Sequence, residues 1–112
     1  MQLATYKKDH YELDNGEEIN REYPDSFWIP EKEAREAIEP GDIVKLIFRM
    51  EEKNGSDEVS VERMWVEVTN KQRDFYIGTL DNDPSGSECV KCGQTVYFQS
   101  CHVIAIFEED ST

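Results

Sequence analysis

The segment Glu62-Arg63-Met64-Trp65-Val66-Glu67-Val68-Thr69 decides the fold of this chain, together with the segment Phe75-Tyr76-Ile77-Gly78-Thr79-Leu80 that follows it. Apolar and polar residues alternate in the first segment, and this is the period of a strand that is buried on one face. The intervening residues 70–74 are polar and supply a turn. The two segments are therefore expected to form an antiparallel pair of strands.

The alternation divides the side chains of the first strand between two faces. Met64, Val66 and Val68 are expected to lie in the core, which leaves the opposite face free for binding. Aromatic side chains on such a mixed face serve as anchors for protein partners; the alternative is that they simply pack. The candidate binding residues are Arg63, Trp65, Glu67 and Trp28.

Further strands are predicted on both sides of this pair. Apolar residues alternate from Asp42 to Met50, and Lys53-Asn54-Gly55-Ser56 is a hairpin signal. Short strands are also expected at residues 94–98 and 103–107. The pattern predicts a mainly β (α+β) fold, either a small, strongly bent five-stranded antiparallel sheet or an SH3-like, partly open barrel. An OB-type barrel is the alternative.

One short helix is predicted on the N-terminal side of the strands. Pro30 suits its start and Pro40-Gly41 ends it. Its apolar stripe is expected to consist of Ala34, Ala37 and Ile38.

The length of 112 residues fits one domain. Residues 1–22 are rich in charge and are expected to form an acidic N-terminal arm, or a hairpin that turns at Asn15-Gly16. Residues 23–107 make a single β-rich domain in this interpretation, and residues 108–112 a frayed tail.

The chain is strongly acidic, with 25 acidic against 12 basic residues and a net charge of -13. It has no basic stripe that could neutralise phosphates, so nucleic-acid binding and anionic membrane surfaces are disfavoured. A basic protein partner would be attracted instead. The alternative is that the acidity only keeps the protein soluble.

The compartment is expected to be the cytoplasm. The sequence contains no apolar run long enough for a transmembrane helix, and its first residues turn polar at once, unlike a signal peptide. Three cysteines are an odd number, which argues against a closed disulfide framework and for reduced thiols.

The sharpest chemical motif is Cys89-Val90-Lys91-Cys92-Gly93, whose two thiols have zinc-knuckle spacing. Tetrahedral zinc takes four nitrogen or sulfur ligands. The candidate ligands are Cys89, Cys92, Cys101 and either His102 or His10. Neighbouring strand residues point to opposite faces, so Cys101 and His102 share an ion only in an irregular turn. The alternative is that Cys92 and Cys101 are small buried apolar groups.

Other chemistry finds little support in the sequence. Asp81-Asn82-Asp83-Pro84 lacks the ligand spacing of a calcium loop and predicts a turn. The sequence has no phosphate-cradling glycine loop, nucleophile elbow or H-E-x-x-H motif. No catalytic residue is therefore named, and zinc is the single cofactor considered.

Four segments, in this order, carry a resemblance to a known family: Phe27-Trp28-Ile29-Pro30, Pro40-Gly41-Asp42-Ile43-Val44-Lys45-Leu46-Ile47-Phe48, Glu62-Arg63-Met64-Trp65-Val66-Glu67-Val68 and Gly78-Thr79-Leu80-Asp81-Asn82-Asp83-Pro84. With these residues the chain resembles the YegJ-like family of bacterial domains of unknown function. The resemblance implies a compact β-rich domain with one N-terminal helix and brings no catalytic residues. The gene neighbourhoods of some members suggest toxin neutralisation. Cys89 and Cys92 depart from the family pattern, which has apolar or aromatic residues there.

Together these observations predict a non-enzymatic protein-interaction module with a basic partner, such as a toxin. Two alternatives stay open. One is a small zinc-stabilised domain that uses Cys89, Cys92 and Cys101, and the other is an enzyme of unrecognised type. The sequence does not indicate an oligomeric state.

Overall fold

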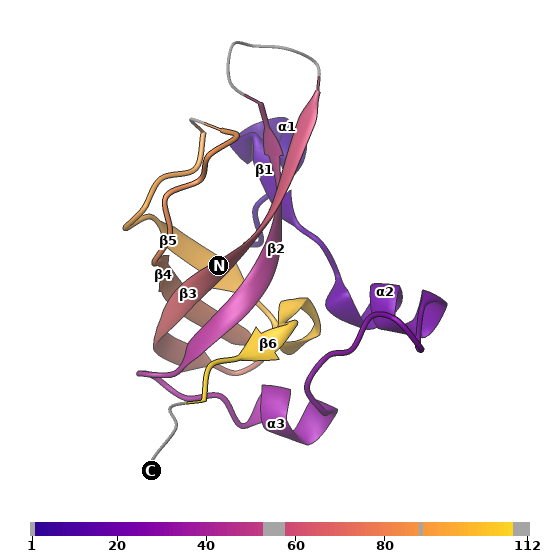
Figure 1. The fold of residues 1–112 in the computed structure, drawn as a ribbon. Helices are drawn as coiled ribbons and strands as arrows, with labels where there is room; N and C mark the ends of the chain where they lie inside the picture. Colours follow the sequence, from indigo (N-terminus) through magenta and orange to yellow (C-terminus); the bar gives the residue numbers. More distant parts are fainter. Residues whose placement is uncertain (1, 53–57, 88, 109–112) are drawn as a thin grey trace.

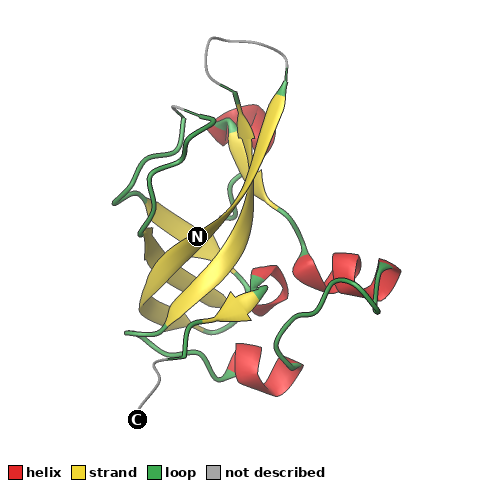
Figure 2. Cartoon of the chain, in the orientation of Figure 1, coloured by secondary structure: helices red, strands yellow, loops and turns green. Residues whose placement is uncertain are grey.

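The computed structural model describes residues 2–52, 58–87 and 89–108, which build a curled antiparallel sheet with a few short helices (Figure 1, Figure 2). The strands are β1 (Tyr11–Leu13), β2 (Ile43–Glu51), β3 (Val59–Gln72), β4 (Phe75–Leu80), β5 (Thr95–Phe98) and β6 (Ala105–Ile106). The helices are α1 (Tyr6–Asp9), α2 (Gly16–Glu22), α3 (Lys32–Glu36) and the 3-10 helix η2 (Ser100–His102). The predicted mainly β fold with a strongly bent antiparallel sheet is confirmed.

Strand β2 pairs with three other strands. The sheet has the order β1-β2-β3-β4-β5, and β6 also pairs with β2. Strand β1 lies opposite residues 48–50 of β2, whereas β6 lies opposite residues 44–45. Segments from the two ends of the chain therefore share one edge of β2 and protect it from pairing with another molecule. Figure 1 shows α2 and α3 outside the curl of the sheet.

The core lies between the inward faces of the strands. Met64, Val66 and Val68 are buried, as the alternation predicted. The ring of Tyr76 stacks on that of Phe98 from the next strand, with 5.2 Å between the ring centroids. Each large apolar side chain buried in this way stabilises the fold by about 1.5–3 kcal/mol.

The turn between β3 and β4 is tighter than predicted. A polar turn over residues 70–74 was expected, but β3 continues to Gln72 and the chain reverses at the next two residues. Arg73 has a φ of 51°, in the left-handed region that tight hairpin turns require. A bulge after Val68 shifts the register so that the two strands stay paired.

The last predicted strand is shorter than expected. Within residues 103–107, β6 covers two residues, while Val103 is fully buried in the core. The N–H of Ile104 donates to the carbonyl of Lys45 at 3.0 Å, so the chain stays attached to β2 before the strand begins. The hairpin signal at residues 53–56 lies outside the described residues.

Asn15-Gly16 begins a helix, and the predicted hairpin turn at this position is wrong. The Oδ1 atom of Asn15 accepts the N–H of Glu18 at 3.1 Å and so caps α2. Gly16 is buried, and a Cβ at this position would lie 2.9 Å from Cγ2 of Ile104. The side chain of Asn15 therefore caps a helix instead of forming a hairpin turn. The missing side chain of Gly16 lets α2 approach the segment before β6 closely. Residues 11–13 belong to the sheet.

The apolar stripe predicted around helix α3 is confirmed only at Ile38, which is buried. Ala34 and Ala37 are exposed, and Arg35 is buried in their place. The prediction failed because polar acceptors surround Arg35 and stabilise its charge inside the structure. Among the helices of the described residues, none has the length and apolar character to cross a membrane.

Candidate functional site

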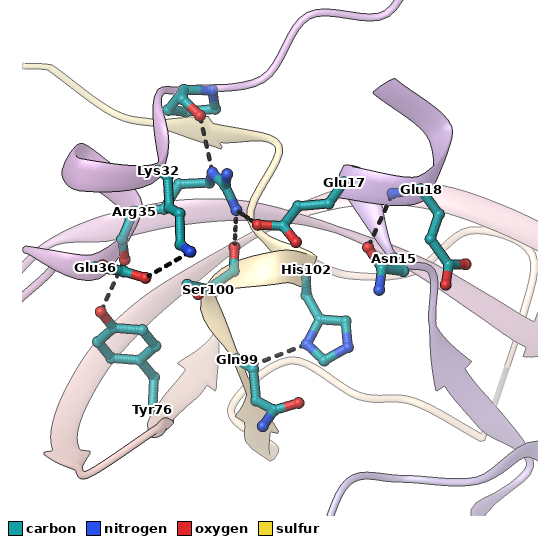
Figure 3. A network of polar contacts seen from close by, with 11 residues as sticks. Asn15, Glu17, Glu18, Lys32, Arg35, Glu36, Tyr76, Gln99, Ser100 and His102 are labelled. Carbon is teal, nitrogen blue, oxygen red and sulfur yellow. Dashed lines mark hydrogen bonds and ion pairs between the residues drawn. The ribbon is translucent and has the colours of Figure 1, made fainter. Parts of the chain in front are cut away.

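Arg35 is the centre of a polar network that joins the helices to the sheet (Figure 3). Its Nε donates to the carbonyl of Pro30 at 2.8 Å, and its Nη1 donates to the Glu17 carboxylate at 2.6 Å and to the Ser100 carbonyl at 3.0 Å. The hydroxyl of Tyr76, on β4, donates to the Arg35 carbonyl at 2.8 Å. The network therefore fixes α2, α3 and η2 relative to the sheet.

Helices α2 and α3, which this network fixes, belong to an acidic segment, which we define as residues 16–42. It contains nine acidic and three basic residues, a net charge of -6. Every carboxylate in it except that of Glu17 belongs to an exposed residue. Two exposed aromatic residues lie among them, Trp28 with 79% of its surface exposed and Tyr23 with 54%. Exposed apolar groups rimmed by charge are typical of protein-binding surfaces.

Trp65 is held in place on the outer face of the sheet. Nζ of Lys45 lies 4.5 Å from the centroid of its ring, and the ring of Phe107 meets it edge-on at 5.9 Å. The backbone of Trp65 is also fixed, since its N–H donates to Oδ1 of Asn82 at 2.5 Å and its carbonyl accepts the N–H of Asp81 at 2.9 Å. The indole is thus preorganised and half-buried.

The remaining residues of the predicted binding face are exposed. Arg63 and Glu67 both face solvent, and Cζ of Arg63 lies 5.5 Å from the ring centroid of Phe27. Two further residues on this face, Val59 and Val61, are exposed as well. They were missed because β3 was predicted to begin at residue 62, although the alternation already extends back to them.

Glu62 fixes the loop between β4 and β5. Its carboxylate accepts the N–H and the hydroxyl of Ser85, at 3.2 and 3.1 Å, and the N–H of Gly86 at 3.0 Å. The Asn82 contact with β3 holds the preceding part of the same loop. Two side-chain contacts therefore attach this loop to β3, and the carboxylates of residues 81–84 form no metal-ligand group within the described residues.

Of the five candidate zinc ligands, the structure brings Cys89 and His10 together, but not Cys92, Cys101 or His102. Cys89 and Cys92 are exposed and Cys101 is half-buried, while His102 is buried. The expectation that Cys92 is a small buried group is therefore wrong. Within the described residues, the three ligand side chains whose donor atoms lie within 4.8 Å of one another are those of His10, Glu51 and Cys89.

Cys101 and His102 are both held in their uncharged forms. Burial raises the pKa of the Cys101 thiol, and the nearby carboxylate of Glu17 raises it further. Burial also lowers the pKa of His102, and Nδ1 of this histidine accepts the N–H of Gln99 at 2.9 Å. A thiol with a raised pKa is a poor nucleophile, so this neighbouring pair lacks the thiolate–imidazolium character of a reactive cysteine.

A surface hollow of about 500 Å³ lies beside η2, with Cys101 in its wall. Its other lining residues include Lys71, Arg73 and Glu36, and Nζ of Lys71 already donates to the carbonyl of Glu36 at 2.7 Å. His102 does not line this hollow. The geometry therefore separates the thiol from the imidazole, which are adjacent in sequence.

The chain is a bacterial domain of unknown function, as the sequence predicted. The chain belongs to the family DUF2314, described as an uncharacterized protein conserved in bacteria, whose family model matches residues 11–105. The match begins at β1, sixteen residues before Phe27, where the first segment of the resemblance starts. Comparisons with curated proteins and with solved structures found no match.

Proposed function

We propose that this domain is a non-enzymatic interaction module that binds a basic protein through the acidic segment. The observation that carries the proposal is Trp28, which is 79% exposed within a segment of net charge -6. A large apolar ring gains free energy when a partner removes it from water. Tryptophan is also among the residues that dominate binding energy at protein interfaces.

The charge of the acidic segment selects the class of partner. Its exposed carboxylates create a negative potential that draws a basic protein toward the surface and speeds association. Salt weakens this attraction, because the Debye length is about 8 Å at physiological ionic strength. The aromatic rings of Trp28 and Tyr23 would then supply the short-range contact.

The outer face of β3 extends the proposed binding surface. The Arg63 side chain contacts Phe27, the residue before Trp28, so the exposed face of β3 adjoins the acidic segment. We include Trp65 and Glu67 in the surface for this reason. Trp65 is already oriented by its neighbours, so its burial by a partner would cost little additional side-chain entropy.

Further observations support the non-enzymatic part of the proposal. The thiol of Cys101 and the imidazole of His102 are held neutral by burial and do not share a hollow. The three cysteines are free, which agrees with a reducing compartment such as the cytoplasm. The proposed membership of the YegJ-like group, with its association with toxin neutralisation, also agrees with a basic partner.

The proposal is tested by affinity capture with the full chain from a bacterial lysate at low and high salt. Wild type is compared with Trp28→Ala and with Tyr97→Ala, which removes an exposed aromatic ring on β5, outside the acidic segment. We expect one basic protein to be retained by wild type and Tyr97→Ala at low salt and lost by Trp28→Ala. The captured protein is then purified and its affinity for each variant measured by calorimetry.

A double variant separates the contribution of charge to binding from that of apolar contact. Glu22→Lys with Asp25→Lys keeps Trp28 but reverses two exposed charges near it in sequence. We expect slower association and a weaker dependence on salt. The proposal is contradicted if the captured proteins bind all variants equally, or if binding is insensitive to salt.

A further inference from the structure

We propose that His10, Glu51 and Cys89 form a binding site for a zinc ion. One donor atom from each of the three side chains lies within 4.8 Å of the other two. His10 and Glu51 are 41 residues apart in the sequence, so the site exists only in the folded chain. It lies where the end of β2 meets the residue before β1 and the loop between β4 and β5. The site is independent of the proposed binding function.

His10 and Glu51 are fixed by the backbone on which they lie. His10 ends α1 in the left-handed region, with a φ of 65°, and its N–H donates to the Tyr6 carbonyl at 3.0 Å. The N–H of Glu51 donates to the His10 carbonyl at 3.0 Å, which extends the ladder between β1 and β2 by one bond. As a result Nδ1 of His10 and Oε2 of Glu51 lie 2.8 Å apart.

Cys89 lies in a loop that is anchored on both sides. Its N–H donates to the hydroxyl of Ser87 at 3.1 Å, and Ser87 is itself buried. Val90, on the other side, is fully buried in the core. Glu62 holds the same loop through the N–H of Gly86. These contacts keep the thiol near the imidazole and the carboxylate, and the anchored loop reduces the entropy that metal binding would cost.

The donor set matches zinc better than the alkaline-earth ions. Nitrogen, sulfur and carboxylate oxygen are the three ligand types that zinc uses, whereas Ca²⁺ and Mg²⁺ require mostly oxygen. Zinc bonds of about 2.0–2.3 Å place ligand atoms about 3.3–3.8 Å apart in a tetrahedron. The donor atoms here lie within 4.8 Å, so closure needs side-chain movements on the order of 1 Å.

Zinc binding requires one deprotonation, and the charges of the three ligands balance that of the ion. The Cys89 thiol releases its proton to solvent, the thiolate and the carboxylate bring two negative charges, and His10 contributes a neutral lone pair. A water molecule completes the fourth position, because all three side chains are accessible. Cys92 and Cys101, which the sequence suggested as ligands, have no part in this site.

The test uses the full chain, stripped with a chelator and kept reduced, and titrates it with Co²⁺ and then with Zn²⁺. A cobalt–thiolate bond gives a charge-transfer absorption band, which zinc should abolish by displacement. We expect a stoichiometric band in wild type and none in Cys89→Ser. His10→Asn and Glu51→Gln should weaken zinc binding by at least about 10-fold. Asparagine is chosen because it tolerates the left-handed conformation of His10.

The other two cysteines provide matched controls. Cys92→Ser and Cys101→Ser should keep the cobalt band and the rise in melting temperature that zinc causes in wild type. Circular dichroism of each metal-free variant shows that it has folded. The proposal is overturned if wild type shows no band, if the band survives in Cys89→Ser, or if Cys92→Ser or Cys101→Ser removes it.

Discussion

The guanidinium of Arg35 and the carboxylate of Glu17 lie 2.6 Å apart, with 6% and 31% of their side chains exposed. Such a pair is costly to bring out of water, and hydrogen bonds to further acceptors offset that cost. Arg35 has two, the carbonyls of Pro30 and Ser100. The pair therefore acts as a structural connection between α2, α3 and η2, and the acidic segment depends on it for its position.

Removing the carboxylate of this pair should destabilise the protein. Glu17→Ala leaves the buried guanidinium of Arg35 without its counter-charge, and we expect the free energy of unfolding to fall by about 2–4 kcal/mol. The control is Asp14→Ala, because Asp14 pairs with Arg49, whose side chain is 42% exposed, at 3.0 Å. We expect a loss of about 0.5–1 kcal/mol there. Urea unfolding measures both values, and equal losses would contradict the role given to Arg35.

Arg35 also shows what the sequence could not predict. The alternation of β3 is a local signal, so the buried positions of Met64, Val66 and Val68 could be predicted from neighbouring residues alone. The acceptors of Arg35 lie 5, 18 and 65 residues away from it. The burial of Arg35 depends on these acceptors, two of which are distant in sequence, so the neighbouring residues alone could not predict it.

The full ligand set of the candidate metal group could not be predicted from the sequence for the same reason. Cys89 was singled out because of a neighbouring thiol, but the structure places that thiol, Cys92, outside the group. Its partners in space are His10, which the sequence offered as an alternative ligand, and Glu51, which the sequence did not suggest. Local spacing identified Cys89 as a candidate ligand. The pairing of β1 with β2, a long-range contact, brings His10 and Glu51 together beside it.

Gly78 should tolerate no side chain. A Cβ there would lie 2.7 Å from the carbonyl oxygen of Glu67 and 2.5 Å from Cγ1 of Val66. Because the first contact is with backbone, the strands would have to separate, and we expect Gly78→Ala to lower the free energy of unfolding by about 2–3 kcal/mol. Thermal and urea denaturation measure the loss.

Gly41 provides the matched control for this glycine. It has a φ of 99°, but a Cβ would meet nothing within 4 Å. Gly41→Ala should therefore cost only the backbone strain of the left-handed region, about 1–2 kcal/mol. A smaller loss for Gly78→Ala than for Gly41→Ala would show that β3 and β4 adjust readily.

His102 should make the stability depend on pH. Burial lowers its pKa in the folded state, while the carboxylate of Glu17 acts in the opposite direction. Well above pH 6.5, the ordinary pKa of histidine, His102 is neutral in both states and contributes no pH dependence. As the pH falls below that value the unfolded chain gains the proton first, so the free energy of unfolding decreases until the pH reaches the folded pKa.

The variant His102→Asn isolates this effect. Asparagine can place an oxygen near the position of Nδ1 and accept the N–H of Gln99, but it does not titrate in this range. The difference in unfolding free energy between wild type and variant should shrink as the pH falls from 7 toward 5. A difference that stays constant would show that the folded protein accepts the proton on His102 without penalty.

The two tryptophans should report opposite surroundings in fluorescence quenching. Trp65→Phe leaves Trp28, which is 79% exposed in the acidic segment, and Trp28→Phe leaves Trp65, with the ammonium of Lys45 4.5 Å from its ring. Trp28 should emit at longer wavelength, and the Cs⁺ cation should quench it better than I⁻, because the carboxylates concentrate cations. Trp65 should be quenched weakly, with I⁻ favoured over Cs⁺. High salt should reduce both preferences.

If I⁻ quenched Trp28 better than Cs⁺ did, the indole would lie outside the negative potential of the acidic segment. A basic partner would then have no electrostatic reason to approach it there.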